Sequence, residues 1–379
     1  MPSARVLTDG RFRAAEEKAI SVGSKEAGLK NWNLIIFLTP MALILAALGP
    51  DRPVLAYGAA GSAGTLRIYF IDVEGGQATL LVTPGGGSLL VDTGWPDANG
   101  RDAGRIVHAA REAGLKKIDF VLITHFHTDH VGGAAELAAR IPVGTFADHG
   151  KDVETGKEAE ALDAGYRKAL ERSKRLIVRP GDSIPLEGAE ATAVTADGAH
   201  VSSPLPHGGQ ADPYCAQSKP QETDPSENAR SVGILVTFGK FRFLDLGDLT
   251  WNKELELMCP TNPIGAVDVF LVSHHGMNIS NSPALVWALH PRVAIMNNGE
   301  TKGGAPEAWQ IVEKSPGLLD LWQLHFSGAG GREHNVAKRK IANLQGNDQG
   351  RELRLAARAD GSFTVANARN GFAKTYAKD

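Results

Sequence analysis

The chain has 379 residues, of which 42% are hydrophobic and 22% charged, ordinary values for a globular protein. Its formal net charge is −3 and it has no long basic run, so bulk electrostatics gives no strong signal for nucleic-acid binding. The length suffices for one large or two modest domains, and no internal repeat or low-complexity array is present.

The first 64 residues differ from the rest. Residues 1–30 are polar with mixed charges, and Leu34–Leu48 is an uncharged apolar run. This run is too short for a comfortable membrane span, which needs roughly 20 residues, but it has the length of a signal-peptide core. Small residues follow in an A-x-A-like arrangement that ends at Ala56. We therefore predict export, periplasmic or secreted, with cleavage near Ala56.

Two alternatives remain for the apolar run. An uncleaved segment 34–48 would anchor the protein with the same external topology, and this would be its only membrane contact. The run would otherwise be a buried core helix. In each case we expect residues 65–379 to form a single folded domain.

The chain has only two cysteines, Cys215 and Cys259, both in proline-rich contexts. Export would permit a disulfide between them. Such a bond would tie the long loop 199–229 to the segment after Trp251. The sequence does not give the distance between the two thiols, so the disulfide is a hypothesis.

Short apolar segments separated by glycine and proline predict the first half of the domain. Strands over 65–73, 78–83 and 88–92 form an opening antiparallel meander, with turns at 75–76 and 84–87. The next predicted elements are a helix over 102–113, a strand over 118–124, a helix over 131–140, a strand over 143–147, a helix over 157–173, and strands over 175–178, 183–185 and 191–195.

The second half repeats this alternation after a long irregular segment. Residues 199–228 are rich in Pro, Ser, Gly and Asp and predict a loop over the site. The elements that follow are strands over 230–238, 241–246 and 267–273, a helix over 282–290, a strand over 293–296, a helix over 306–313, a strand over 319–326, and a final pair over 351–357 and 363–367. Two sheets with helices on the outside fit this order.

A histidine loop, Thr124–Gly133 with the sequence THFHTDHVGG, follows the apolar strand IDFVLIT. It places His125, His127, Asp129 and His130 at the carboxyl end of a strand, where ligand sites of α/β sheets gather. Imidazole and carboxylate suit zinc, iron and manganese. The first two histidines point the same way in an extended loop, whereas the adjacent pair diverges. This pattern favours two neighbouring metals over a merely solvated polar loop.

Polar residues also end three other predicted strands. They are Asp92 in VDTG, Asp248 in LGDL, and His274-His275 in VSHHG. Each alone could be an ordinary turn residue. Together with the histidine loop, they supply further metal-ligand chemistry at strand ends.

In this order, the motifs resemble those of the metallo-β-lactamase-fold metallohydrolases, over roughly Leu66–Asn297. The similarity is closest to the branch that holds the hydrolase domain of competence (DNA-uptake) channel proteins and the phosphorylcholine esterases. The segments that carry it are YFIDVEGGQATLLVTPGGGSLLVDTG, THFHTDHVGG, ENARSVGILVTFGKFRFLDLGD and VDVFLVSHHG. The resemblance implies an α/β fold, a four-layer αβ/βα sandwich of two mixed β-sheets flanked by helices.

The resemblance also implies a ligand set for two Zn²⁺ ions per chain, with Mn or Fe as alternatives. His125 and His127 would bind the first ion, and Asp129 and His130 the second. Asp248 would bridge the two ions. His274, or alternatively His275, would complete the second site, and Asp92 would orient the metal loop.

The chain departs from the family pattern at the third histidine of the first site. The candidates are Asp197, His200, His207 and, earlier, His149, and none has the expected context. We therefore expect a non-histidine ligand, a water, or weak binding at this position.

These features predict a metal-dependent hydrolase that uses a metal-bound hydroxide, with Asp129 or Asp248 accepting the proton. No G-x-S-x-G motif points to a serine nucleophile. The branch favours a phosphodiester substrate. The alternatives are a carboxylic ester, lactone or β-lactam at the same site, or a degenerate, non-catalytic binding domain. Four further residues are candidate substrate contacts or ordinary loop residues: Asn297, Asn298, His334 and Asn335. The sequence gives no indication of oligomeric state.

Overall fold

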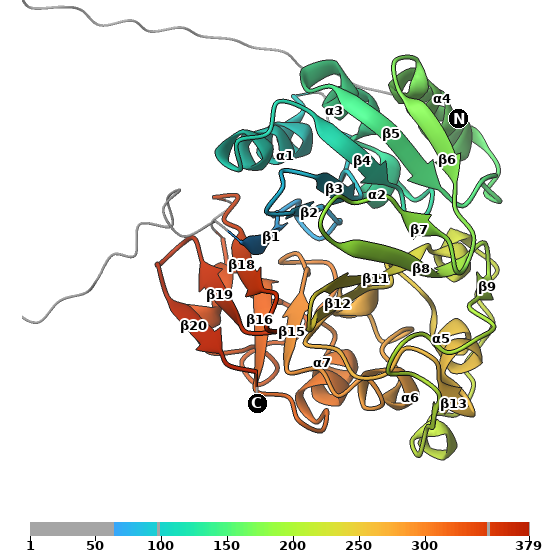
Figure 1. The fold of residues 1–379 in the computed structure, drawn as a ribbon, viewed down its shortest axis with the longest axis vertical. Helices are drawn as coiled ribbons and strands as arrows, with labels where there is room; N and C mark the ends of the chain where they lie inside the picture. Colours follow the sequence, from blue (N-terminus) through green and yellow to red (C-terminus); the bar gives the residue numbers. More distant parts are fainter. Residues whose placement is uncertain (1–63, 97–98, 347–348, 379) are drawn as a thin grey trace, which may run out of the picture. The chain divides into compact units, whose positions relative to one another are not determined.

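The computed structural model describes residues 64–96, 99–346 and 349–378 (Figure 1). All of them belong to one compact unit, Val54–Asp379. The apolar run 34–48 and the predicted cleavage site at Ala56 lie outside the described residues. Among the described helices, none combines the length and the apolar character that a membrane crossing requires.

The first sheet has nine strands in the order β20-β19-β18-β1-β2-β3-β4-β5-β6. Strands β1, β2 and β3 form the predicted antiparallel meander, and β3 to β6 continue in parallel. Its strands are β1 Thr65–Phe70, β2 Thr79–Val82, β3 Ser88–Val91, β4 Ile118–Leu122, β5 Val143–Asp148, β6 Lys174–Ile177, β18 Leu353–Arg358, β19 Phe363–Asn367 and β20 Ala373–Tyr376.

The second sheet is also mixed, in the order β17-β16-β15-β14-β12-β11-β8-β7, with β9 paired to β8. Strands β12, β14, β15, β16 and β17 pair in parallel, and β7, β8, β11 and β12 pair antiparallel. Its strands are β7 Ser183–Ile184, β8 Glu190–Ala196, β9 Ala199–His200, β11 Gly233–Phe238, β12 Phe241–Asp245, β14 Val269–Leu271, β15 Val293–Met296, β16 Asp320–His325 and β17 Ile341–Asn343. A separate small ladder joins β10 Gln210–Ala211 to β13 Thr261–Asn262.

Helices cover the outer face of each sheet (Figure 1). Those on the first sheet are α1 Arg101–Glu112, α2 Thr128–Val131, α3 Ala134–Arg140 and α4 Lys157–Leu170. Those on the second are α5 Trp251–Met258, α6 Pro283–Val286 and α7 Pro306–Glu313. Four short 3₁₀ segments complete the described elements: η1 Cys215–Gln217, η2 Glu227–Arg230, η3 Ser273–Gly276 and η4 Lys338–Lys340.

The two-residue alternation of the strands builds the layers. In β1, Leu66, Ile68 and Phe70 enter the core between the sheets, whereas Tyr69 packs toward the helices. In β12, Phe243 enters the same central core and Leu244 the core under α5 to α7. Because both faces of each sheet are covered, central strands such as β2 and β3 are apolar throughout. The predicted four-layer αβ/βα sandwich is confirmed.

Several local predictions were wrong. The predicted helix over 282–290 is only the single turn Pro283–Val286, and the strand predicted from 230 begins at Gly233 because η2 precedes it. Helix α5 was not predicted, because its buried face carries the charged Glu254 beside Leu257 and Met258. The edge strand β20, AKTY, was missed because three of its four residues are not buried.

The structure contains the hypothesised disulfide between Cys215 and Cys259, whose Cα atoms are 5.8 Å apart. It ties η1 to the C-terminal end of α5, 44 residues further along the chain. By loop-closure entropy, a bond of this span contributes roughly 4 kcal/mol of stability. The long loop is further held by the Trp251 indole N–H, which donates to the Lys219 carbonyl at 2.9 Å. The end of this loop contacts the histidine loop, where Glu227 Oε2 accepts the Phe126 N–H at 3.0 Å.

Candidate metal centre

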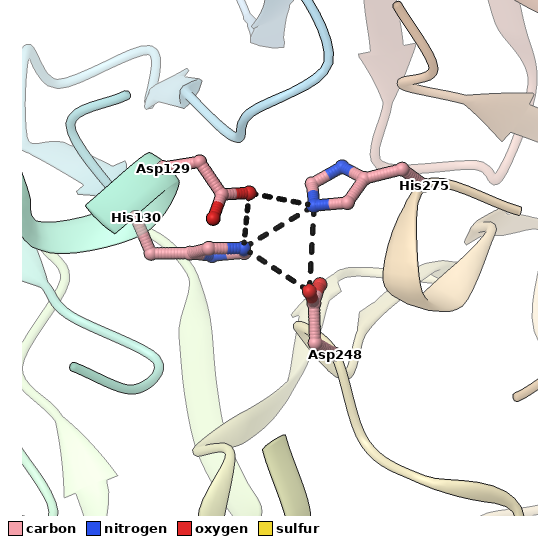
Figure 2. A group of neighbouring side chains, drawn as sticks. All are labelled: Asp129, His130, Asp248 and His275. Carbon is pink, nitrogen blue, oxygen red and sulfur yellow. Dashed lines mark hydrogen bonds and ion pairs between the residues drawn. The ribbon is translucent and has the colours of Figure 1, made fainter. Parts of the chain in front are cut away.

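The polar strand ends of both sheets meet at one place. The histidine loop follows β4 of the first sheet, whereas Asp248 follows β12 and His275 follows β14 of the second. Figure 2 shows Asp129, His130, Asp248 and His275 pointing toward one another. One ligand atom from each lies within 4.8 Å of all the others, and all four residues are buried. We refer to these four residues as the Asp/His group.

The His130 Nε2 atom lies at the centre of the Asp/His group. It is 3.2 Å from Asp129 Oδ2, 3.3 Å from Asp248 Oδ2 and 3.2 Å from His275 Nε2. The His275 Nε2 atom lies 3.2 Å from Asp129 Oδ2 and 3.4 Å from Asp248 Oδ2. Two imidazole nitrogens and two carboxylate oxygens therefore converge, which is the donor set of a divalent transition metal.

The two consecutive histidines both reach Asp248. The His274 Nε2 atom is 3.3 Å from Asp248 Oδ2, and its Nδ1 is 3.3 Å from Ser280 Oγ. His275, rather than the preferred His274, also reaches Asp129 and His130. Both residues have left-handed backbones, with φ of 53° and 54°, a conformation that costs on the order of 1–3 kcal/mol for a non-glycine residue. The Asp/His group thus favours His275, and His274 stays a predicted ligand on the Asp248 side.

The other half of the loop brings His125 and His127 together. Their nearest nitrogens, His125 Nε2 and His127 Nδ1, are 3.1 Å apart. The outer nitrogens have other partners: His125 Nδ1 lies 3.0 Å from Thr124 Oγ1, and His127 Nε2 lies 3.5 Å from Glu154 Oε1. Burial, together with the charge of His130, holds the pKa of His125 well below its ordinary value. His125 is therefore neutral, the form that binds metals.

Asp92 ties the two halves of the loop to β3. Its Oδ1 accepts the Thr124 N–H at 2.8 Å, and its Oδ2 accepts the Thr124 hydroxyl at 2.7 Å. The same Oδ2 lies 2.7 Å from His130 Nδ1, which turns His130 Nε2 toward the Asp/His group. This arrangement suits the predicted orienting role of Asp92.

The buried carboxylates of the site need positive charge close by. Burial would raise the pKa values of Asp129 and Asp248, but the neighbouring imidazoles outweigh it and hold both pKa values well below the ordinary range. Burial would likewise lower the pKa of His130, but Asp248, Asp129 and Asp92 raise it well above its ordinary value. The buried carboxylates are thus balanced by protonated imidazole. Asp248 Oδ1 is buried and has no hydrogen-bond partner among the described residues. The residues present therefore fit a bound metal.

Lys302 adds a second positive charge that the sequence did not reveal. It lies in the loop between β15 and α7, and its Nζ pairs with Asp129 Oδ2. The same Nζ lies 5.0 Å from the centre of the Trp95 ring, a cation–π contact. The lysine side chain is 29% exposed, so it lies between the Asp/His group and solvent.

The four residues considered for the third position of the first metal lie elsewhere. His149 is buried, with its Nε2 2.8 Å from Glu227 Oε2. Asp197 pairs with Arg230 at the surface, and His200 contacts the Val201 carbonyl through Nδ1. His207 lines a separate cavity of about 670 Å³. Among the described residues, none of these four is hydrogen-bonded or ion-paired to His125 or His127, and none belongs to the Asp/His group.

The four candidate substrate contacts mostly have local partners. Asn335 bonds to Ser327 and Gln323 within its own loop region, and His334 Nε2 contacts Gln310 at 2.8 Å. The Asn298 amide donates to the carbonyls of Gly299 and His325. Asn297 differs, because its amide reaches Gln77 Oε1 at 3.3 Å, across to the segment after β1. The Oδ1 atoms of both Asn297 and Asn298 are buried without a partner in the described part of the chain.

A group of buried imidazoles and carboxylates between the strand ends of an αβ/βα sandwich defines a metallohydrolase-type centre. Residues 72–212 match the model of the metallo-β-lactamase superfamily, the family whose motifs the sequence resembles.

Two curated relatives are also similar to this chain. Recombination protein 2 of Haemophilus influenzae is 26% identical over 255 residues, which covers 67% of this chain and 27% of that protein. ComE operon protein 3 of Bacillus subtilis is 25% identical over 250 residues, which covers 62% of this chain and 28% of that protein. The chain therefore spans about a quarter of the length of these relatives. The solved metallo-beta-lactamase fold protein YhfI from Bacillus subtilis matches with a TM-score of 0.43 and 10% identity, over 69% of this chain and 96% of that one.

Replacing Asp92 tests its orienting role. In Asp92→Asn, an amide NH₂ takes the place of Oδ2, which faces both the Thr124 hydroxyl and His130 Nδ1. We expect affinity for a divalent metal to fall about 10- to 100-fold, measured by competition with a chromophoric chelator. Asp163→Asn, at an exposed position on α4, serves as the control. Unchanged affinity in Asp92→Asn would contradict the role.

Glu254 predicts a pH dependence of stability. Its buried carboxylate accepts hydrogen bonds from the N–H groups of Asn281 and Ser282 at 2.7 and 2.6 Å. The Asn281 side chain in turn accepts the N–H of Ser273, the residue before His274. Burial raises the pKa of Glu254 from 4.5 to about 7. The folded state therefore binds this proton more tightly than the unfolded state. The contribution is complete below pH 4.5 and is lost as the pH rises through about 7, at most about 3 kcal/mol.

The Glu254→Gln variant isolates this contribution. We expect the loss of unfolding free energy between pH 5 and pH 8 to be smaller in the variant than in the wild type, measured by urea denaturation at both pH values. The variant is also expected to be less stable at pH 5, because a glutamine has one acceptor oxygen for two N–H donors. Equal pH slopes in the two proteins would rule out a raised pKa.

Proposed function

We propose that this protein hydrolyses a phosphodiester at a dinuclear zinc centre. His125 and His127 would hold one ion. The other ion would be held by Asp129, His130, Asp248 and one of the pair His274 and His275. When bound, the ions would supply Lewis-acid polarisation of a substrate oxygen and activation of water.

The number of donors supports two ions. Five imidazole nitrogens and two carboxylates gather here, whereas zinc takes about four ligands. The two halves are neighbours, since the His125 and His130 ring centres are 4.1 Å apart. A single zinc ion would leave several of these imidazoles without a metal, whereas two ions could use all of them.

The observation that carries the phosphodiester assignment is the position of Lys302. Its ammonium lies beside Asp129 at the edge of the Asp/His group and is held there by Trp95. Once Asp129 is neutralised by a metal, this ammonium is free to bind an anionic oxygen of the substrate. A phosphodiester carries such an oxygen next to the phosphorus that is attacked, whereas the carbonyl of a neutral ester does not.

The site also offers a proton acceptor for the proposed reaction. Within the Asp/His group, Asp248 Oδ1 is a buried carboxylate oxygen that has no hydrogen-bond partner among the described residues, so we assign it as acceptor of the proton from the attacking water. The water oxygen forms a bond to phosphorus as the bond from phosphorus to the ester oxygen breaks, and the departing oxygen takes the proton from Asp248 and leaves as an alcohol. Lys302 would balance the charge on the non-bridging oxygen.

A substrate panel tests this function. We expect bis-p-nitrophenyl phosphate to be hydrolysed faster than p-nitrophenyl acetate or a chromogenic cephalosporin, and Asp129→Ala to abolish turnover. Lys302→Ala should lower kcat/KM for the phosphodiester about 10- to 100-fold and leave any acetate hydrolysis unchanged. Lys314→Ala, at an exposed position after α7, is the matched control.

Two outcomes would contradict the proposal. Preferred turnover of the acyl ester or cephalosporin would assign the site to a carboxylic ester, lactone or β-lactam. No turnover of any substrate, with well under one metal per chain after gentle purification, would favour a non-catalytic binding domain.

We also propose that the protein is exported. The disulfide between Cys215 and Cys259 supports this, because such bonds persist in oxidising compartments. We expect N-terminal sequencing of the mature protein to find a start near Ala56. An intact Met1 in the membrane fraction would indicate an uncleaved anchor, and an intact Met1 in a soluble cytosolic fraction would contradict export.

A further inference from the structure

Glu227 is a fully buried carboxylate that joins three segments of the chain. It lies in η2, where the long loop ends, and its side chain has no solvent exposure. Its Oε2 accepts the Phe126 N–H at 3.0 Å and lies 2.8 Å from His149 Nε2. Its Oε1 accepts the Val153 N–H at 2.8 Å. A buried charge is costly unless it is paired and hydrogen-bonded, and here three donors meet one carboxylate.

These contacts converge on the first half of the histidine loop. Phe126 lies between His125 and His127, so the bond to its N–H fixes the backbone from which both imidazoles project. The Phe126 ring also packs against His149 and Tyr166, with ring centres 5.1 and 5.4 Å apart. The backbone of the loop is thus held on one side by Glu227, as it is held on the other by Asp92.

A second line of contacts runs from Glu227 to the His127 ring. Glu227 holds the N–H of Val153 and donates its own N–H to Oε1 of Glu154 at 3.2 Å. That same oxygen lies 3.5 Å from His127 Nε2. A carboxylate on this side favours a proton on Nε2 and leaves the Nδ1 lone pair directed at His125.

We propose that Glu227 is the positioning residue of the metal site formed by His125 and His127, and that Glu154 is its intermediary on His127. This inference rests on the proposed dinuclear centre. Neither glutamate is assigned as a ligand: Glu227 acts through the Phe126 backbone, and Glu154 acts on the outer nitrogen of His127. The segment 149–154 and the end of the long loop would thereby support the site of His125 and His127. Asp92 would support the site of His130 in the same way.

The chemistry of Glu227 suggests a near-isosteric test. A glutamine has one acceptor oxygen, so Glu227→Gln leaves at least one of its three donors facing an amide NH₂. Glu154→Gln removes the charge beside His127 Nε2 but keeps an acceptor oxygen. Glu171→Gln, at an exposed position at the end of α4, is a control with the same chemical change.

The experiment is a stepwise Zn²⁺ titration of the full-length variants against a chromophoric chelator. We expect the wild type and Glu171→Gln to bind two ions, and Glu227→Gln to bind one with unchanged affinity and the other about 10- to 100-fold more weakly. Glu154→Gln should weaken the same ion by about 10-fold. Excess Zn²⁺ should restore the kcat of Glu227→Gln. The selective weakening of one ion distinguishes the positioning role from general instability, which would weaken both ions.

The outcomes separate this inference from the proposed function. Selective weakening of one ion supports the positioning role, even if no phosphodiester is turned over. Equal weakening of both ions, unchanged binding in both glutamate variants, or a single ion in the wild type would overturn it. If Glu227→Gln does not fold, Glu154→Gln alone decides, because the Glu154 side chain is 37% exposed and its replacement disturbs less of the packing.

Discussion

The burial of negative charge between two sheets is the constraint on which this centre depends. Asp92, Asp129 and Asp248 are all removed from water, and a buried carboxylate is tolerated only with a compensating charge or hydrogen bonds. The imidazoles around them provide that compensation. These ionisable groups therefore lie together at the strand ends, whereas the three hydrophobic cores of the sandwich are apolar.

The backbone is strained at several of the residues that carry these groups. Asp92, His274 and His275 all have positive φ angles, of 62°, 53° and 54°. Close backbone approach has a similar role at Gly133, where a Cβ atom would lie 2.2 Å from the Thr93 carbonyl oxygen. The paired glycines that end the histidine loop let the first turns of α2 and α3 pack against the segment after β3. Contacts with outer partners then favour one inward nitrogen in His125, His130 and His274.

The sequence predicted what depends on local periodicity and missed what depends on distant contacts. Strand alternation predicted two sheets with helices outside. The motifs at strand ends predicted that His125, His127, Asp129, His130 and Asp248 lie close together, as they do in the structure. Lys302 and Glu227 were missed because they reach the histidine loop from 173 and 101 residues away, and no local pattern marks them. His149 was considered for the first metal because it ends a strand, but its ring faces Glu227 instead. A choice between adjacent His274 and His275 needs backbone angles that a sequence does not give.

The origin of the donors has a thermodynamic consequence. Asp129 and His130 come from the first sheet, whereas Asp248 and His275 come from the second, so an ion held by all four fastens the two sheets to each other. Such an ion binds the folded chain far better than the unfolded one. Folding stability is then coupled to the free metal concentration, rising by about 1.4 kcal/mol for each tenfold increase above the dissociation constant. The concentration of free metal would thus set the stability of the fold as well as the hydrolytic activity.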